Sequence, residues 1–128
     1  MNLKQEADKW FSLYMRLRNA TEDGFVICFT CGKIYHYQDT DCGHFISRGN
    51  LANRYNERNC KVQCVSCNRF KNGNIKVFEQ QLEKKYGKEI LAELNNNKKV
   101  LKRYTKEDYQ EIIDIYKSKV KELLNEIN

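Results

Sequence analysis

The chain contains 128 residues, of which 31% are charged and 41% hydrophobic, with six cysteines, no proline and a formal net charge of +6. This composition excludes a chain that is disordered throughout, and its length fits one domain with one modest core. No apolar run approaches the roughly 18 residues that a membrane span needs, and the opening MNLKQEADKW lacks an apolar signal core. We therefore expect a cytoplasmic protein without membrane contact, whose reduced cysteines bind metal instead of forming disulfides.

The first expected element is a helix over residues 3–19, because apolar residues recur there at helical spacing. The turn residues Thr21-Glu-Asp-Gly24 end this helix. The β-prone stretch 25–29 follows and leads into the tight turn between Cys28 and Cys31.

After this turn the predicted elements are short strands and then helices. The β-prone runs and the polar stretches between them predict, in order, strands at 34–37 and 42–46 joined through 38–41, a polar loop at 47–59, and an extended piece at 61–63. Apolar residues at helical spacing then predict helices at 75–86, 90–94 and 105–127, the last opened by a capping box at Thr105 and Asp108. Apolar residues at this spacing far more often pack in a core or against another helix than form a functional site.

Four of the six cysteines form two pairs with the spacing of metal ligands. Cys28 and Cys31 are separated by two residues, as are Cys64 and Cys67, and this spacing lets both thiolates of a pair reach one ion. Two such turns complete a tetrahedral structural zinc site, which has no open position for catalysis. The remaining two cysteines lack such partners and are predicted to be buried thiols or to have a role that the sequence leaves open: Cys42 and Cys60.

Positive charge is concentrated around the second cysteine pair. Residues 44–76 contain seven Lys or Arg against one acid, so this segment carries the whole net charge of the chain. A focused positive field is typical of proteins that bind a polyanion such as DNA, although a solvated basic surface would give the same count.

The segment between the cysteine pairs also contains a possible catalytic group. A lone histidine is usually structural, and we assign His36 no functional role. His44 differs because Asn59 lies 15 positions after it and Asn68 lies 24 positions after it, next to the last zinc-pair cysteine.

These motifs resemble a known family. The pattern CFTCG…DCGHFISRGN…RYNERNCKVQCVSCNRFKNGN…YG, from Cys28 to Tyr86, is similar to the NinG (Rap) recombination proteins of lambdoid phages. Its histidine, central asparagine and final asparagine also resemble the ββα-metal motif of HNH nucleases, many of which carry a four-cysteine zinc site. The resemblance implies a metal-dependent DNA endonuclease that acts in recombination on branched DNA or DNA with single-stranded parts.

The resemblance also implies a role for each site residue. His44 is the general base that deprotonates water, and Asn59 orients its ring through the amide oxygen. Asn68 is an oxygen ligand of a catalytic Mg²⁺ or Mn²⁺ ion. Many HNH enzymes place a second acidic ligand just before the histidine, where this chain has Gly43. Asp41 is the best substitute, and the alternative is an acid that serves only the hairpin turn.

The expected fold is of the α+β class, a single domain over residues 1–128. A helix at 3–19 precedes a zinc-stapled HNH-like core at 25–74, and a helical part at 75–128 follows. Two non-catalytic alternatives remain: a zinc-stabilised DNA-binding module, and an adaptor that presents a protein surface. The sequence leaves open whether the last helix builds a homodimer. The residues expected to hold DNA phosphates are Arg48, Arg54, Arg69 and Lys71.

Overall fold

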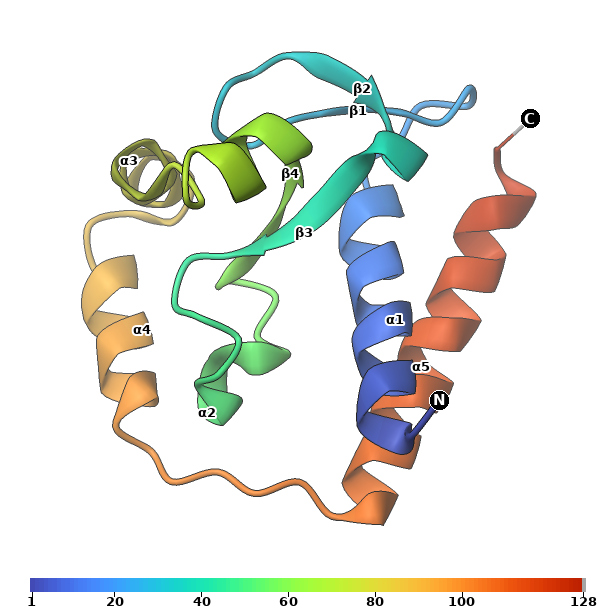
Figure 1. The fold of residues 1–128 in the computed structure, drawn as a ribbon, viewed down its shortest axis with the longest axis vertical. Helices are drawn as coiled ribbons and strands as arrows, with labels where there is room; N and C mark the ends of the chain where they lie inside the picture. Colours follow the sequence, from blue (N-terminus) through green and yellow to red (C-terminus); the bar gives the residue numbers. More distant parts are fainter. Residues whose placement is uncertain (128) are drawn as a thin grey trace.

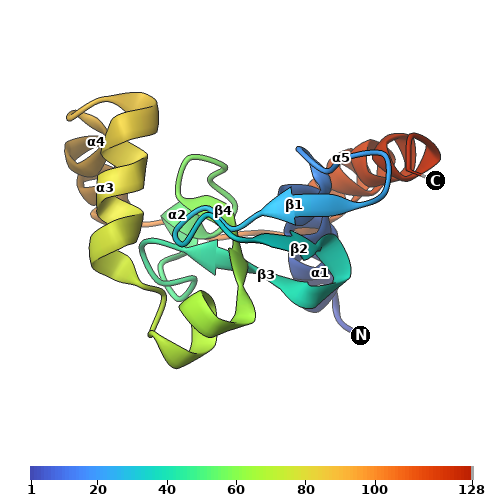
Figure 2. The same ribbon diagram turned by 90° about the horizontal axis from the view of Figure 1, so that it is seen from above.

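The computed structural model describes residues 1–127 and combines five α-helices with two small sheets within that part of the chain. Helices α1 and α5 form one side of the molecule, α3 and α4 form the other, and strands β3 and β4 lie between them (Figures 1 and 2). The elements, in chain order, are α1 (Leu3–Leu17), β1 (Phe25–Ile27), β2 (Ile34–His36), the 3₁₀ turn η1 (Tyr37–Asp39), β3 (Thr40–His44), α2 (Leu51–Arg54), β4 (Cys60–Cys64), the π-helical turn η2 (Ser66–Phe70), α3 (Ile75–Tyr86), α4 (Ile90–Lys98) and α5 (Lys106–Asn125). The prediction of an α+β protein is therefore correct.

The strands pair differently from the sequence prediction. The two strands expected to form a hairpin, β2 and β3, belong to separate two-stranded sheets: β1 pairs with β2, and β3 pairs with β4. The turn after Cys28 causes the first pairing, because the Cys28 amide donates to the Lys33 carbonyl at 2.9 Å and Gly32 takes a positive φ of 76°. β2 is thereby folded back onto β1, and β3 pairs with β4 instead.

Helices α1 and α5 build the core behind the β3–β4 sheet. They run side by side in the same direction, as Figures 1 and 2 show. The Phe11 ring meets the Tyr116 ring edge-on at 5.0 Å, and Met15 and Cys60 complete this buried cluster. Full burial of a side chain such as Phe11 stabilises the fold by roughly 1.5–3 kcal/mol.

A second cluster forms on the opposite side, between α3 and α4. Its buried members are Phe78, Leu82, Ile90 and Leu94. The Phe45 ring, just beyond the end of β3, packs on Phe78 with ring centres 5.6 Å apart. The β3–β4 sheet is therefore held from both sides, which fixes the end of β3 in space.

The boundaries of α1, α3 and α5 agree with the prediction to within two residues, whereas α4 continues through the predicted end at residue 94 to Lys98. α1 ends at Leu17 and α5 at Asn125, within two residues of the predicted ends, and the capping box at Thr105 and Asp108 is formed. The predicted loop at 47–59 contains the short helix α2, capped by the side chain of Asn50. The last residue of the predicted C-terminal part, 128, lies outside the described residues.

No helix within residues 1–127 is both long enough and apolar enough to cross a membrane.

Candidate functional site

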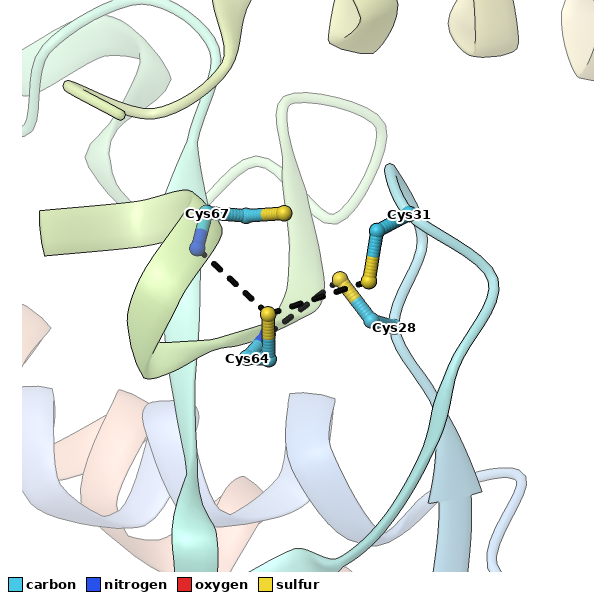
Figure 3. Close-up of side chains that lie close together, drawn as sticks. All are labelled: Cys28, Cys31, Cys64 and Cys67. Atoms are coloured by element: carbon cyan, nitrogen blue, oxygen red, sulfur yellow. Dashed lines mark hydrogen bonds between the residues drawn. The ribbon is translucent and has the colours of Figure 1, made fainter. Parts of the chain in front are cut away.

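The two cysteine pairs converge on one point, as their spacing predicts. The sulfur atoms of Cys28, Cys31, Cys64 and Cys67 all lie within 4.8 Å of one another and point toward a common centre (Figure 3). The first pair comes from the turn between β1 and β2, and the second from the end of β4 and the start of η2. The cluster therefore ties the β1–β2 hairpin to the β3–β4 sheet.

The four thiols fit a tetrahedral metal ion. Zn–S bonds of about 2.3 Å at tetrahedral angles place sulfur atoms about 3.8 Å apart, and the sulfurs of Cys31 and Cys64 are 3.8 Å apart. Backbone amides also support the thiolate form: Cys64 N donates to Cys28 Sγ at 3.2 Å, and Cys67 N to Cys64 Sγ at 3.4 Å. Burial alone would raise the pKa of Cys28, but the hydrogen bonds that its sulfur accepts, from the backbone of Cys31 and Cys64 and from Thr30, lower it to about 6. This cluster could hold a structural metal such as zinc.

His44 is the last residue of β3, and its imidazole is half-buried. Its Nε2 lies 3.0 Å from the backbone carbonyl of Arg54. A carbonyl oxygen can only accept, so a neutral ring carries its proton on Nε2 and keeps the lone pair of Nδ1. Burial lowers the pKa of His44 from its ordinary value, although the carbonyls of Arg54 and Cys42 partly oppose this effect. The ring is therefore neutral at pH 7.

The Asn59 side chain hydrogen-bonds to Ile46 and Asn53 and not to the His44 ring, contrary to the expectation from sequence. Its side chain is fully buried, and its amide oxygen accepts from Ile46 N at 2.8 Å. Its amide nitrogen donates to the carbonyls of Ile46 and Asn53. The Asn59 amide thus holds together the loop between β3 and β4. The group that hydrogen-bonds to the His44 ring is the Arg54 carbonyl, and not Asn59 as expected.

Asp41 and Asn68 lie next to each other, as the sequence suggests for two parts of one site. Asn68 Nδ2 donates to Asp41 Oδ2 at 2.9 Å. Arg69 forms a bidentate ion pair with the same carboxylate: Nε donates to Oδ2 at 2.9 Å and Nη2 donates to Oδ1 at 2.8 Å. Burial would raise the pKa of Asp41, but the hydrogen bonds from Arg69 and Asn68 outweigh it and lower the pKa below its ordinary value.

Gly43, where many HNH enzymes carry an acid, has a structural reason to be glycine. A Cβ at this position would lie 2.6 Å from Cδ of Gln63, whose side chain crosses β3 at that point. Gln63 is fully buried and donates to Thr30 Oγ1 and to the Gly73 carbonyl, while its Oε1 has no partner among the described residues. A carboxylate therefore cannot be placed at position 43 without displacing Gln63.

Two adjoining surface hollows collect most of the predicted residues. One, of about 460 Å³, lies beside His44, and the other, of about 320 Å³, lies beside Asp41. Both hollows are lined by three of the same residues, Cys42, Arg48 and Asn68. Arg16 and Arg69 also line the second hollow, so its rim carries three arginines. Lys71 is exposed just beyond η2.

Arg54, which the sequence predicts to hold a phosphate, has structural partners inside the protein. The residue is 6% exposed, and its guanidinium forms a bidentate ion pair with Asp8 of α1. The Nε atom lies 2.9 Å from Oδ1, and Nη2 donates to Oδ2. Its Nη1 donates to the Arg48 carbonyl at 2.7 Å, and Tyr55 Oη donates to the same aspartate. Arg54 therefore fastens the loop between β3 and β4 to α1.

The sequence interpretation also missed residues that line the hollow beside Asp41 or lie close to His44. Ser12 and Arg16 of α1 reach the site, and no spacing rule connects them to residues about 30 positions away. Cys42 and Cys60 were predicted to be buried thiols, and Cys60 is buried while Cys42 is partly exposed. The sequence interpretation did not anticipate that a ligand atom of each lies within 4.8 Å of the other and of a ring nitrogen of His44. The i, i+2 spacing of Cys42 and His44 on a strand was a signal that could have placed these two side chains on one face.

Comparison with known proteins places the chain in a phage family. A family model described as Bacteriophage Lambda NinG protein matches residues 1–126. Over 97–99 residues, the chain is 34% identical to protein ninG of Escherichia phage lambda, 33% to that of Escherichia phage 933W and 32% to that of Salmonella phage P22. These alignments cover 75–77% of this chain and 47–48% of the relatives, so the chain spans about half their length. No solved structure matches the chain.

The match over residues 1–126 includes α1 and α5, which the motif resemblance did not cover. The cysteine pairs and His44 lie inside it. The chain belongs to the NinG family.

Proposed function

We propose that this chain is an HNH-type, metal-dependent DNA endonuclease that hydrolyses phosphodiester bonds in branched or partly single-stranded DNA. The observation that carries the proposal is the arrangement around Asn68: the hollow that it shares with His44 adjoins the hollow that it shares with Asp41. A neutral imidazole, an amide and a carboxylate therefore face one basic surface. The order of β3, β4 and η2, two paired strands followed by a short helical turn, supports the proposal of a ββα-metal core.

His44 has the features that a general base requires at neutral pH. Its lowered pKa keeps it unprotonated, and the hydrogen bond from Nε2 to the Arg54 carbonyl leaves Nδ1 to receive a proton from water. Nε2 keeps its proton, because its partner, the Arg54 carbonyl, cannot accept a full proton transfer. The Arg54 carbonyl thus holds the ring in the tautomer that can act.

Asp41 and Asn68 provide the oxygen atoms that Mg²⁺ or Mn²⁺ prefers. When bound there, such an ion supplies positive charge to the phosphate oxygens as negative charge develops. Arg69 occupies both oxygens of Asp41 and must leave before the carboxylate can act as a ligand. The Arg69 side chain is 63% exposed, so its movement toward a phosphate is not blocked by packing.

DNA would lie across the arginine rim of the second hollow and reach Lys71. The rim is lined by three arginines: Arg16, Arg48 and Arg69. Asp41 is the one negatively charged side chain among the residues that line this hollow. Such contacts bind the phosphate backbone with little regard to sequence, which suits an enzyme that recognises DNA shape.

A specific observation favours the main alternative, a DNA-binding module without catalysis. Asp41 accepts three hydrogen bonds, two from Arg69 and one from Asn68, so the only acid at the site is fully engaged. If Arg69 stays on Asp41 when DNA binds, the site lacks a carboxylate ligand. In that case the arginines still bind phosphate.

The test is a nicking assay with branched and duplex DNA in Mg²⁺, Mn²⁺ or EDTA. His44→Ala should reduce nicking by roughly 10²–10⁴-fold, the usual worth of a positioned base, and should leave DNA affinity unchanged. Arg69→Ala should weaken DNA binding but lower the Mg²⁺ concentration needed, because it frees Asp41. Arg48→Ala is the matched control, since it removes a rim arginine without freeing a carboxylate. Parent protein that binds branched DNA but never nicks it would establish the non-catalytic alternative.

A further inference from the structure

A second group of metal-binding side chains surrounds His44. Cys42, His44 and Cys60 each offer a ligand atom, and these atoms all lie within 4.8 Å of one another. Cys42 and His44 are two positions apart on β3 and therefore point to the same face of the strand. Cys60 of β4 is the direct antiparallel partner of His44. The three side chains thus converge on the side of the sheet that faces α1.

The geometry fits a zinc ion with three protein ligands. Tetrahedral zinc needs its sulfur and nitrogen ligands roughly 3.5–3.8 Å apart, so the side chains need to close by at most about 1 Å. His44 already has the support that metal-bound histidines commonly have, because its Nε2 hydrogen-bonds to the Arg54 carbonyl. We assign Nδ1 as the ligand atom, because Nε2 is already engaged with the Arg54 carbonyl.

The surroundings leave room for a fourth ligand. A hollow of about 70 Å³ beside Cys42 and His44 is lined by Ser12 and Arg48, among others. That volume holds about two water molecules. Two thiolates would balance the charge of a Zn²⁺ ion, and Arg48 would favour an anionic oxygen at the open position. Thiolate and imidazole ligands favour zinc over Mg²⁺, which prefers oxygen.

We propose that Cys42, His44 and Cys60 form a second zinc site, and that zinc bound there switches off the active site by occupying His44. The metal-binding part of this proposal stands on the three side chains alone. The inhibitory part rests on the proposed nuclease function, since it requires His44 to be the base. A zinc-bound Nδ1 cannot accept a proton from water, so one residue would serve either as a ligand or as a base.

The binding test starts from protein that carries its first equivalent of zinc and adds Co²⁺ as the probe. Co²⁺ bound by thiolates gives a strong charge-transfer absorption, so the parent protein should show this band as one equivalent binds. Cys42→Ser and His44→Ala should each weaken that binding by more than about tenfold, since losing even a residue that only orients a metal ligand costs about 10–100-fold in affinity. Ser12→Ala is the matched control, because Ser12 lines the same hollow but offers no thiolate or imidazole.

Absence of the band in the parent protein, or an equal band in Cys42→Ser, would overturn the site. The inhibitory part is tested by the ratio of nicking with and without added Zn²⁺, measured separately for each variant. At saturating Zn²⁺ this ratio should lie roughly 10²–10⁴-fold below one in the parent, because the base is lost. In Cys42→Ser the ratio should stay close to one. Equal inhibition of both proteins would refute the switch. A parent that binds Co²⁺ but never nicks refutes the nuclease, and the switch with it, without affecting the metal site.

Discussion

Replacing Arg54 by Ala separates a structural role for this arginine from a DNA-binding one. The side chain is 7% exposed, and its two-armed ion pair with Asp8 joins the loop between β3 and β4 to α1. With Arg54 in place the Asp8 side chain is only 22% exposed, so Arg54→Ala leaves a largely buried carboxylate without its cationic partner. We therefore expect loss of stability, and no change in DNA affinity at temperatures where the variant is folded.

The magnitude follows from the burial of the pair. Removing one partner of a buried ion pair costs about 3–5 kcal/mol, and partial exposure of Asp8 places this case near the lower end, at about 3 kcal/mol. An unfolding entropy of about 2.1 cal/mol/K per residue then predicts a fall in Tm of about 10 °C for a chain of this size. The double variant Asp8→Asn/Arg54→Ala should be more stable than Arg54→Ala alone, because it leaves no unpaired charge.

The pH dependence gives an independent check. Burial raises the pKa of Asp8, but the hydrogen bonds from Arg54 and Tyr55 outweigh it, so the folded-state pKa lies below the ordinary value of 3.8. The pair therefore contributes stability that is present above pH 3.8 and is lost as the pH falls through the folded-state pKa. The difference in Tm between the parent and Arg54→Ala should be largest near pH 7 and shrink in acid. Unchanged Tm together with weaker DNA binding would refute this reasoning.

Three further changes test other parts of the structure. Gly43→Ala should cost roughly 1–3 kcal/mol by overpacking against Gln63, while Gly49→Ala, where the nearest atom to a new Cβ is 3.7 Å away, should be nearly neutral; similar thermal shifts for both would contradict the collision. Cys64→Ser, or prolonged treatment with a strong chelator, should unfold the region around the cysteine cluster, because metal-binding energy is folding energy there; unchanged circular dichroism and Tm would show that the cluster needs no metal. Lys71→Ala should weaken binding to all DNA sequences alike and lower the salt slope by about one unit; an unchanged salt slope would place Lys71 outside the interface.

Those parts of the site that depend on local spacing were predictable from the sequence. Two residues between the members of each cysteine pair place both thiols on one turn, so the four-cysteine cluster follows from the chain itself. The neighbouring positions of Cys67 and Asn68 likewise bring the asparagine close to that cluster. The capping box of α5 is a four-residue pattern and is formed as predicted.

Long-range contacts account for the errors. β-propensity marks residues 34–36 as a strand but does not select the partner, and the tight turn after Cys28 decides that pairing. A count of positive charges cannot distinguish Arg54, which is buried against Asp8, from Arg48, which is exposed. Asp8 and Arg54 are 46 positions apart, and no periodic pattern connects them.

The cysteine cluster and the candidate site are mechanically coupled through η2. Its π-helical turn begins at Ser66, and the Cys67 amide is held by Cys64 Sγ. On the far side, the side chain of Asn74 donates to Cys67 Sγ at 3.6 Å. Asn68 is thereby fixed between two contacts to the cluster, and it projects its amide to Asp41 on β3. A metal at the four thiols would thus position Asn68 without touching it, because the residue that holds the metal and the one that faces the hollow are adjacent in the chain.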